Sequence, residues 1–190
     1  DEMPPVDIAF SSWSTIKIPV LLTLFKNLEP PYDPAILAEI EDMVEQSSNE
    51  STDYVAKKVI EPNLAPLRIT DDIRALGLEN TFWAGFFGLG SPLLKDISTP
   101  ANQSGAYDTD PDRYGQTTVS DLGILLEEIY YCSRDYGGAI PLVFEGTITR
   151  EECGMMIDYL SKNKIGHLIE AGVPAGTVVA HKHGWANEYA

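Results

Sequence analysis

Apolar positions in the first part of the chain recur with the spacing of α-helices. Between Ser14 and about Leu28 they fall on most sides of a helix, a pattern that is typical of a central, buried helix. Pro19 lies near the start of this segment, where a missing backbone N–H costs least. The apolar residues of the segment are Ile16, Ile18, Val20, Leu21, Leu22, Leu24 and Phe25.

Two more helices follow after a linker at 29–32. Asp33 has the position of an N-cap and Pro34 that of a first helical residue, so the second helix is predicted to begin there. A turn over 46–49 leads into the third. The apolar positions with helical spacing are Ile36, Leu37, Ile40, Met43 and Val44 in the second helix and Val55, Ala56, Val59 and Ile60 in the third.

The remaining segments alternate between helices and irregular chain. Thr70 is predicted to cap a short helix that stops at Gly77. Residues 86–116 are rich in Gly, Pro, Asp, Asn and Ser, and a structureless run of that length is usually a functional loop or a disordered one.

The last part of the chain holds two helices and a strand. A helix is predicted from Thr118 to about Ser133, and a capping box from Thr149 to Glu152 opens another. Residues 176–185 have the β-branched composition of a strand. The chain is therefore predicted to be mostly helical, with few strands.

Length and charge limit the classes of partner. The 190 residues suit one large domain or two small ones. Lys and Arg total 13 against 29 Asp and Glu, and the net charge of -16 repels nucleic acids and anionic membranes. No apolar stretch is long enough to span a bilayer. The acidic start, Asp1-Glu2, is unlike a secretory signal, although a mature secreted form remains compatible with it.

The cysteines are too few for a disulfide-rich scaffold or a zinc site. Cys132 and Cys153 each fall in a predicted helix. A disulfide between the two helices would indicate an oxidising compartment. Two buried thiols explain the same sequence equally well. We expect neither a metal nor a cofactor.

Three short motifs carry the candidate chemistry. Ser14 and Lys17 form an S-x-x-K, and because residues three apart share a helix face, the amine can reach the hydroxyl of a candidate nucleophile. About one such motif is expected by chance in a chain of this size. The second motif, Ser47-Ser48-Asn49, lies at a turn, and the third, Lys182-His183-Gly184, lies in the predicted strand.

In this order, the motifs resemble the S-x-x-K, S-D-N and K-T-G set of class A β-lactamases and penicillin-binding proteins. The stretches 9–13, 116–118 and 172–185 are also similar to that superfamily, so the resemblance covers about the whole chain. It implies an α+β fold, with helices packed on a small antiparallel sheet that is incomplete in this chain. Only 13 residues precede Ser14 and six follow Gly184, so we expect a single domain over 1–190 without the flanking strands and helices of the family. Either the chain is a fragment of a larger protein, or these elements come from elsewhere.

The resemblance implies a role for each motif residue. Ser14 would attack a carbonyl, and a neutral Lys17 would take its proton, helped by burial and by the nearby ammonium of Lys182. Ser47 would relay the proton to the leaving nitrogen. Asn49 would hydrogen-bond the substrate or Lys17. The substrate would also be held by Lys182 and by His183-Gly184-Trp185, with the oxyanion hole formed by the backbone N–H groups of Ser14 and Trp185.

Two departures from the motifs affect this reading. His183 stands where the family has a Thr that helps bind the substrate carboxylate. Strand alternation also puts Lys182 on the face opposite His181 and His183, so His183 ranks below Lys182 as a binding residue. Ser48 stands where the family has a structural Asp, and we expect little loss from that change.

The largest departure is in the long loop. Class A enzymes have a Glu there that activates the deacylating water, and this chain has no Glu between Glu79 and Glu127. Asp121 has the position of a helix start. The cluster over 108–112 would supply a base or bind a cation, but an acidic turn is the simpler interpretation. The sequence therefore does not predict efficient hydrolysis of β-lactams.

The sequence leaves three functions open. The first is a serine hydrolase that forms an acyl-enzyme from an amide or ester, either β-lactam-like or peptide-like. The second is a penicillin-binding, peptidase-like protein that releases its acyl group slowly, and the third is a non-catalytic binding domain of the same fold. The expected partner is a small molecule or peptide, and the expected location is the cell envelope or the extracellular space, where related proteins meet antibiotics.

Overall fold

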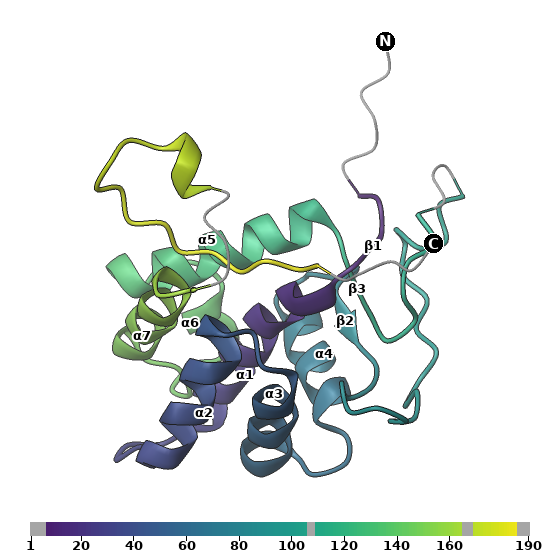
Figure 1. Ribbon diagram of the computed structural model, residues 1–190, viewed down its shortest axis with the longest axis horizontal. Helices are drawn as coiled ribbons and strands as arrows, with labels where there is room; N and C mark the ends of the chain where they lie inside the picture. Colours follow the sequence, from purple (N-terminus) through teal and green to yellow (C-terminus); the bar gives the residue numbers. More distant parts are fainter. Residues whose placement is uncertain (1–6, 106–108, 165–168, 186–190) are drawn as a thin grey trace.

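The computed structural model describes residues 7–105, 109–164 and 169–185 (Figure 1). Its helices in chain order are the 3₁₀ turn η1 (Trp13–Ile16), α1 (Lys17–Asn27), α2 (Pro34–Glu45), α3 (Asn49–Val55), the π-helical turn η2 (Ala56–Ile60), α4 (Ala65–Ala75), α5 (Val119–Asp135), α6 (Ile140–Val143), α7 (Arg150–Ser161) and the 3₁₀ turn η3 (Glu170–Gly172). Its strands are β1 (Phe10–Ser11), β2 (Phe82–Trp83) and β3 (Gly115–Thr117). The prediction of a mostly helical chain with few strands is confirmed.

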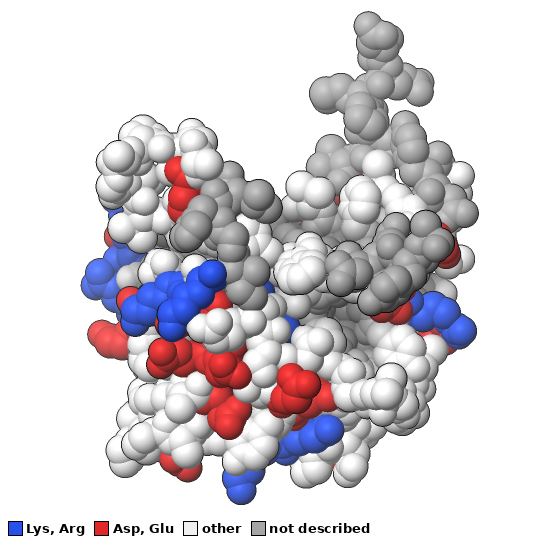
Figure 2. All heavy atoms as spheres, in the orientation of Figure 1, with Lys and Arg blue, Asp and Glu red and all other residues white. Residues whose placement is uncertain are grey.

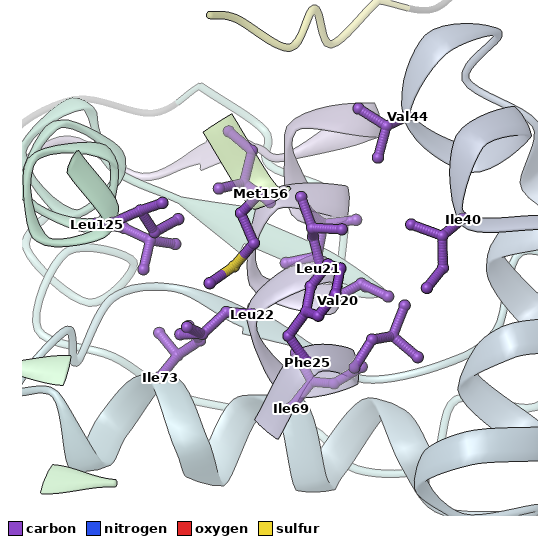
Figure 3. Packing of buried hydrophobic residues seen from close by; sticks show 14 of the residues in the cluster. Val20, Leu21, Leu22, Phe25, Ile40, Val44, Ile69, Ile73, Leu125 and Met156 are labelled. Atoms are coloured by element: carbon purple, nitrogen blue, oxygen red, sulfur yellow. The ribbon is translucent and has the colours of Figure 1, made fainter. Parts of the chain in front are cut away.

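Helix α1 is the centre of the hydrophobic core, as its all-round apolar pattern predicted. Nine of its 11 residues are buried, and it contacts α2, α4 and α7. Each fully buried Leu or Phe stabilises the fold by about 1.5–3 kcal/mol. Figure 3 shows the side chains that meet there: Val20, Leu21, Leu22 and Phe25 of α1, Ile40 and Val44 of α2, Ile69 and Ile73 of α4, Leu125 of α5 and Met156 of α7.

A small antiparallel sheet lies at the end of the molecule where the chain enters η1. Its strand order is β1-β3-β2, and Phe10 pairs with Thr117 in the register. Directly after β1, the Ser12 N–H donates to the Gly115 carbonyl at 2.9 Å. A side chain at Gly115 would lie 2.6 Å from the Ser12 hydroxyl oxygen, so glycine at this position leaves room for the Ser12 side chain. The sheet thereby fixes the backbone that leads into Ser14.

Three predicted helix starts are confirmed by their caps. The Asp33 carboxylate accepts an N–H of the first turn of α2 at 2.9 Å, and Pro34 follows it. Thr118 caps α5. Thr149 and Glu152 form the reciprocal capping box of α7, in which the Thr149 N–H donates to Glu152 at 2.7 Å. Such caps each contribute about 1 kcal/mol, so particular residue types are strongly preferred at these positions. That preference allowed these helix starts to be predicted from the sequence.

The prediction that Thr70 caps a helix is wrong. Helix α4 begins five residues earlier, at Ala65, and Thr70 lies in its middle. The Thr70 hydroxyl donates to the Pro66 carbonyl and accepts the Trp83 N–H at 2.9 Å, so it joins α4 to β2. A mid-helix threonine can bond backward in this way, and sequence alone does not distinguish it from a cap. Gly77, with φ of +83°, ends this helical region as predicted.

The predicted strand at 176–185 is also not formed among the residues that the structure describes. This segment runs extended toward η1 (Figure 1), and its His181 N–H donates to the Leu160 carbonyl at the end of α7 at 3.1 Å. A strand needs a partner strand with which to exchange backbone hydrogen bonds. The sheet consists of β1, β3 and β2, and residues 176–185 are not part of it. The β-branched composition therefore produced an extended segment but no strand.

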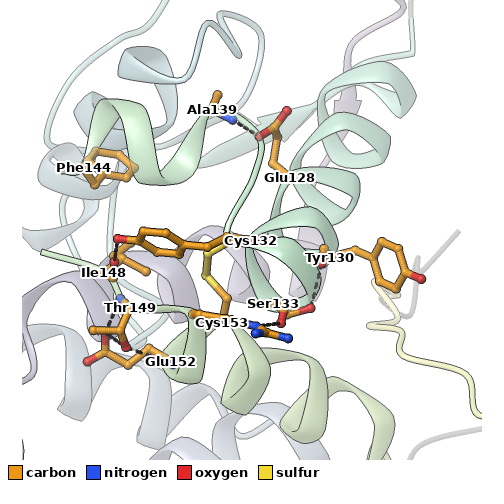
Figure 4. Close-up of a disulfide and its surroundings, with 12 residues drawn as sticks. Glu128, Tyr130, Cys132, Ser133, Ala139, Phe144, Ile148, Thr149, Glu152 and Cys153 are labelled. Carbon is orange, nitrogen blue, oxygen red and sulfur yellow. Dashed lines mark hydrogen bonds between the residues drawn. A yellow bond between two sulfur atoms is a disulfide. The ribbon is translucent and has the colours of Figure 1, made fainter. Parts of the chain in front are cut away.

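A disulfide joins Cys132 of α5 to Cys153 of α7 (Figure 4), with 5.8 Å between the Cα atoms. Of the two alternatives left open by the sequence, the structure has the bonded one. Closing a loop of this size, with a sequence separation of 21, stabilises the fold by about 3 kcal/mol in the chain-entropy model.

Candidate active site

Ser14 and Lys17 are brought together by a change of helix type. Ser14 lies in the 3₁₀ turn η1, whereas Lys17 is the first residue of α1, so the predicted α-helix begins three residues later than expected. Side chains three apart eclipse each other in a 3₁₀ turn. Accordingly, Lys17 Nζ lies 3.1 Å from Ser14 Oγ.

The Ser47-Ser48-Asn49 turn approaches Lys17 from the start of α3. Ser48 caps α3 by accepting the Ser51 N–H at 3.0 Å, a structural task, as expected for this position. Its neighbours face the amine: Lys17 Nζ lies 2.7 Å from the Ser47 carbonyl, 3.2 Å from Ser47 Oγ and 2.7 Å from Asn49 Oδ1. Ser47 has a φ of +60°, and such strained backbone gathers at functional sites.

Lys182 completes the group from the other end of the chain. Its Nζ donates to Ser47 Oγ at 2.8 Å and to the His183 carbonyl at 3.2 Å. The Ser47 hydroxyl therefore lies between two amines. Both lysines are buried, with relative exposures of 1% for Lys17 and 8% for Lys182.

The acceptors around Lys17 show how a neutral amine would be oriented. A neutral amine has two N–H bonds and one lone pair. The Ser47 carbonyl and Asn49 Oδ1 can only accept, and they are its nearest partners, each at 2.7 Å. When both N–H bonds serve these oxygens, the lone pair remains for the hydroxyl hydrogen of Ser14. The geometry thus prepares Lys17 to receive a proton from Ser14.

Burial and charge shift both amines toward the neutral form. Burial, followed by repulsion from Lys182, lowers the pKa of Lys17 from 10.5 to about 7, against the opposing effect of Asp53 and Glu50. Burial lowers the pKa of Lys182 to about 8. Both shifts favour the neutral amine, and the shift is larger for Lys17 than for Lys182.

A cavity of about 470 Å³ opens over Ser14. Asn49 and Trp185 line it together with Ser14, and so do all three members of the aromatic cluster at Trp83, Phe86 and Phe87. The Phe87 ring lies 4.9 Å from Lys17 Nζ and shields it from water. The cavity is thus lined both by residues of η1 and by aromatic rings from the segment after β2.

Two of the candidate binding residues serve other contacts. The His183 ring packs against the His181 ring, with 4.5 Å between centroids, and lies outside the described cavity lining. A side chain at Gly184 would lie 2.9 Å from the Ser12 carbonyl oxygen. Gly184 therefore permits the close approach of the Lys182 segment to η1.

Sequence reasoning missed Asp53. This buried carboxylate on α3 accepts the Phe87 N–H at 3.0 Å and the Gly88 N–H at 2.8 Å, so it fixes the loop that holds Phe87 over Lys17. A signal was present: Asp53 lies four residues after Asn49, on the same face of the helix.

Among the described residues that line the cavity, the carboxylate is Asp112, and no Glu is present. Asp121 instead accepts the Thr81 hydroxyl at 2.9 Å at the start of α5, a structural contact, as predicted. Asp108, part of the acidic cluster considered as a base or cation site, lies outside the described residues.

The chain belongs to the beta-lactamase enzyme family, whose model matches residues 37–190. This match covers Ser47, Asn49 and Lys182, and it begins after Ser14 and Lys17. A comparison with curated protein sequences gives no significant match.

Solved structures share the fold at low sequence identity. A β-lactamase from Desulfarculus baarsii aligns with a TM-score of 0.64 and 18% identity over 95% of this chain and 66% of its own. A β-lactamase from Chitinophaga pinensis aligns with a TM-score of 0.63 and 14% identity over 100% of this chain and 70% of its own.

A third similar structure is a mutant of PBP-A, described as an acyl-enzyme complex with penicillin G. It gives a TM-score of 0.62 and 19% identity over 95% of this chain and 65% of its own. The chain thus spans about two thirds of the length of these structures, and the fold inferred from the motifs is confirmed.

Proposed function

We propose that this protein is a serine hydrolase that forms an acyl-enzyme from an amide or ester substrate, either β-lactam-like or peptide-like. The observation that carries the proposal is the buried Lys17 amine, which lies 3.1 Å from Ser14 Oγ and has its pKa lowered to about 7. At about pH 7, ordinary surface lysines are protonated and cannot act as bases. The membership of the beta-lactamase enzyme family supports the same reaction class.

In the proposed acylation, Ser14 Oγ attacks the substrate carbonyl carbon while Lys17 takes the hydroxyl proton. The backbone N–H groups of Ser14 and Trp185 stabilise the negative charge that develops on the carbonyl oxygen. As the C–N or C–O bond breaks, the proton passes from Lys17 through the Ser47 hydroxyl to the leaving atom. Water then hydrolyses the Ser14 ester and releases the acid.

The position of Lys182 supports two further roles. Its ammonium donates to Ser47 Oγ at 2.8 Å, which leaves the Ser47 hydrogen directed toward another acceptor and suits a proton relay. The same charge provides a local attraction for a substrate carboxylate. A net charge of -16 offers no long-range steering of anions, so this attraction has to act at short range.

Labelling with a fluorescent penicillin tests the proposal. We expect covalent labelling, and a peptide map should place the adduct on the peptide that holds Ser14. Ser14→Ala should abolish it, whereas Ser133→Ala, a serine substitution on α5 outside the cavity, should not. Absence of labelling in correctly folded protein would favour the third function, a non-catalytic binding domain.

A second candidate function is a penicillin-binding, peptidase-like protein that acylates and then releases its acyl group slowly. The specific observation is that the described cavity lining contains Asp112 but no Glu to activate a deacylating water. In a chase with unlabelled penicillin, slow release predicts an adduct that persists for hours. Loss of the label within seconds would favour the efficient hydrolase.

We also propose that the protein acts outside the cytoplasm, on the cell envelope or on antibiotics that reach it. The Cys132–Cys153 disulfide supports an oxidising environment. Thiol titration of protein from its native host, denatured without reductant, tests this proposal. Two free thiols would argue against it.

A further inference from the structure

The cavity over Ser14 has an unusual balance of apolar and charged groups. Six aromatic side chains line it, and its described lining contains no Lys or Arg. The charged member of that lining is the carboxylate of Asp112. The aromatic residues are Trp13, Trp83, Phe86, Phe87, Tyr114 and Trp185.

Asp112 is held in place by its neighbours, although its side chain is exposed. Its N–H donates to Ser11 Oγ at 2.8 Å, and its carbonyl accepts the Gln116 side-chain amide at 2.9 Å. Its carboxylate oxygen Oδ1 accepts the Tyr114 N–H at 2.9 Å. These bonds fix the carboxylate at the cavity rim, beside the strand that leads to Ser14, without neutralising its charge.

Two cations outside the cavity lining have partners of their own. Arg113, the next residue, pairs with Asp96 at 2.8 Å. Lys182 donates to Ser47, outside the cavity lining. Figure 2 shows acidic side chains gathered over α2 and α3, and the net charge of -16 adds a field of the same sign. The cavity therefore favours a positive group and disfavours a negative one.

We infer that the cavity takes the acyl portion of the substrate, and that this portion is an apolar or aromatic group bearing a protonated amine, which Asp112 recognises. This inference rests on the proposed function. The substrate would then have its carboxylate near Lys182 and its ammonium near Asp112, with Ser14 attacking the carbonyl between them. Aromatic walls add favourable contact with the cation.

Three penicillins that share a nucleus and a phenyl group test the inference. Ampicillin carries an ammonium on the acyl group, penicillin G carries no charge there, and carbenicillin carries a carboxylate. We expect second-order rate constants for acylation to fall in that order, by about threefold to fivefold at each step, as for an exposed charge pair. Raising the salt concentration should compress the differences.

Substitutions assign the preference to one residue. Asp112→Asn keeps an oxygen for the Tyr114 N–H, so the fold should persist while the preference for ampicillin over carbenicillin disappears. Asp112→Lys should reverse the order. Asp135→Asn removes a negative charge from α5, outside the cavity, and should leave the preference for ampicillin over carbenicillin unchanged.

The outcomes separate the two proposals. Acylation by none of the three compounds would overturn the proposed function itself. Acylation at equal rates, or a preference that survives in Asp112→Asn, would overturn the inference about Asp112 and leave the proposed function standing.

Discussion

Lys182 Nζ donates a 2.8 Å hydrogen bond to Ser47 Oγ across a sequence separation of 135 residues. The same hydroxyl lies 3.2 Å from Lys17 Nζ. One small hydroxyl thus connects the amine beside Ser14 to a second amine from the far end of the chain. The charge on Lys182 also helps to lower the pKa of Lys17.

The rate of acylation should depend on pH through these two groups. Lys17, with a pKa lowered to about 7, accepts a proton only when neutral, so the rate should rise with pH up to about 7. Lys182, with a pKa of about 8, loses its charge above that pH, so substrates with a carboxylate should react more slowly there. Stopped-flow labelling with penicillin should give a bell-shaped profile with its maximum between these values.

A fluorophosphonate without a carboxylate serves as the control for that profile. Its labelling of Ser14 should keep the acid limb and lose the alkaline one. A flat profile between pH 5 and 8 would contradict the assignment of Lys17 as the base.

Lys17→Met should separate stability from activity. Lys17 is almost fully buried, and an apolar side chain of similar length avoids the cost of desolvating its amine, which is the main cause of its lowered pKa. We expect labelling to be lost while the free energy of unfolding in urea rises by about 1 kcal/mol or more. Lys162→Met, an exposed lysine that pairs with Asp158, should change stability by less than about 0.5 kcal/mol. A destabilised but active Lys17→Met variant would refute the prediction.

Asp53→Asn tests the support of the loop over Lys17. Asparagine offers one acceptor oxygen, so it cannot keep the bonds to both the Phe87 and Gly88 N–H groups. We expect the maximal acylation rate to fall by about 10- to 100-fold, as for a displaced active-site group. Because the Asp53 charge raises the pKa of Lys17, the acid limb of the profile should also move to lower pH.

Glu50→Gln is the matched control for Asp53→Asn. Glu50 also raises the pKa of Lys17 by its charge, whereas the bonds that hold the loop come from Asp53. Glu50→Gln should move the acid limb of the pH profile to lower pH without slowing the maximal acylation rate. If Asp53→Asn behaves in the same way as Glu50→Gln, the carboxylate acts through charge alone and the loop does not depend on it.

Gly184→Ala tests whether the approach of the Lys182 segment to η1 is needed. The added Cβ would lie 2.9 Å from the Ser12 carbonyl and 3.0 Å from a Thr15 methyl, so the segment has to move away. We expect labelling to slow by about 100-fold, since a shift of about 1 Å is enough to have that effect. Gly172→Ala, which meets nothing within 4 Å, should label normally. Equal labelling of both variants would show that the approach is dispensable.

Features that depend on near neighbours in the chain could be predicted from the sequence. The buried helix α1, the caps at Asp33 and Thr118, and the capping box at Thr149 were all anticipated, because helical periodicity and capping involve residues a few positions apart. The pairing of Ser14 with Lys17 belongs to the same group, although the turn that produces it is a 3₁₀ turn.

Features that join distant segments were harder to predict. Thr70 was assigned to a cap because its bond to Trp83 comes from another element, and 176–185 was assigned to a strand because its composition does not show whether a partner strand is present. The part played by Asp53 was missed for the same reason, since the N–H groups it accepts lie 34 and 35 residues away.

By itself, the sequence determined which side chains were available and which of them share a local face: a hydroxyl and an amine three residues apart, a serine-rich turn and a distant lysine. Only the tertiary structure decided that Lys17 and Lys182 share the Ser47 hydroxyl, that Cys132 bonds to Cys153, and that Asp112 faces an aromatic cavity. The physical reason is the range of the forces involved. Backbone hydrogen bonds and helical periodicity act over a few residues, whereas burial and charge depend on how the whole chain packs.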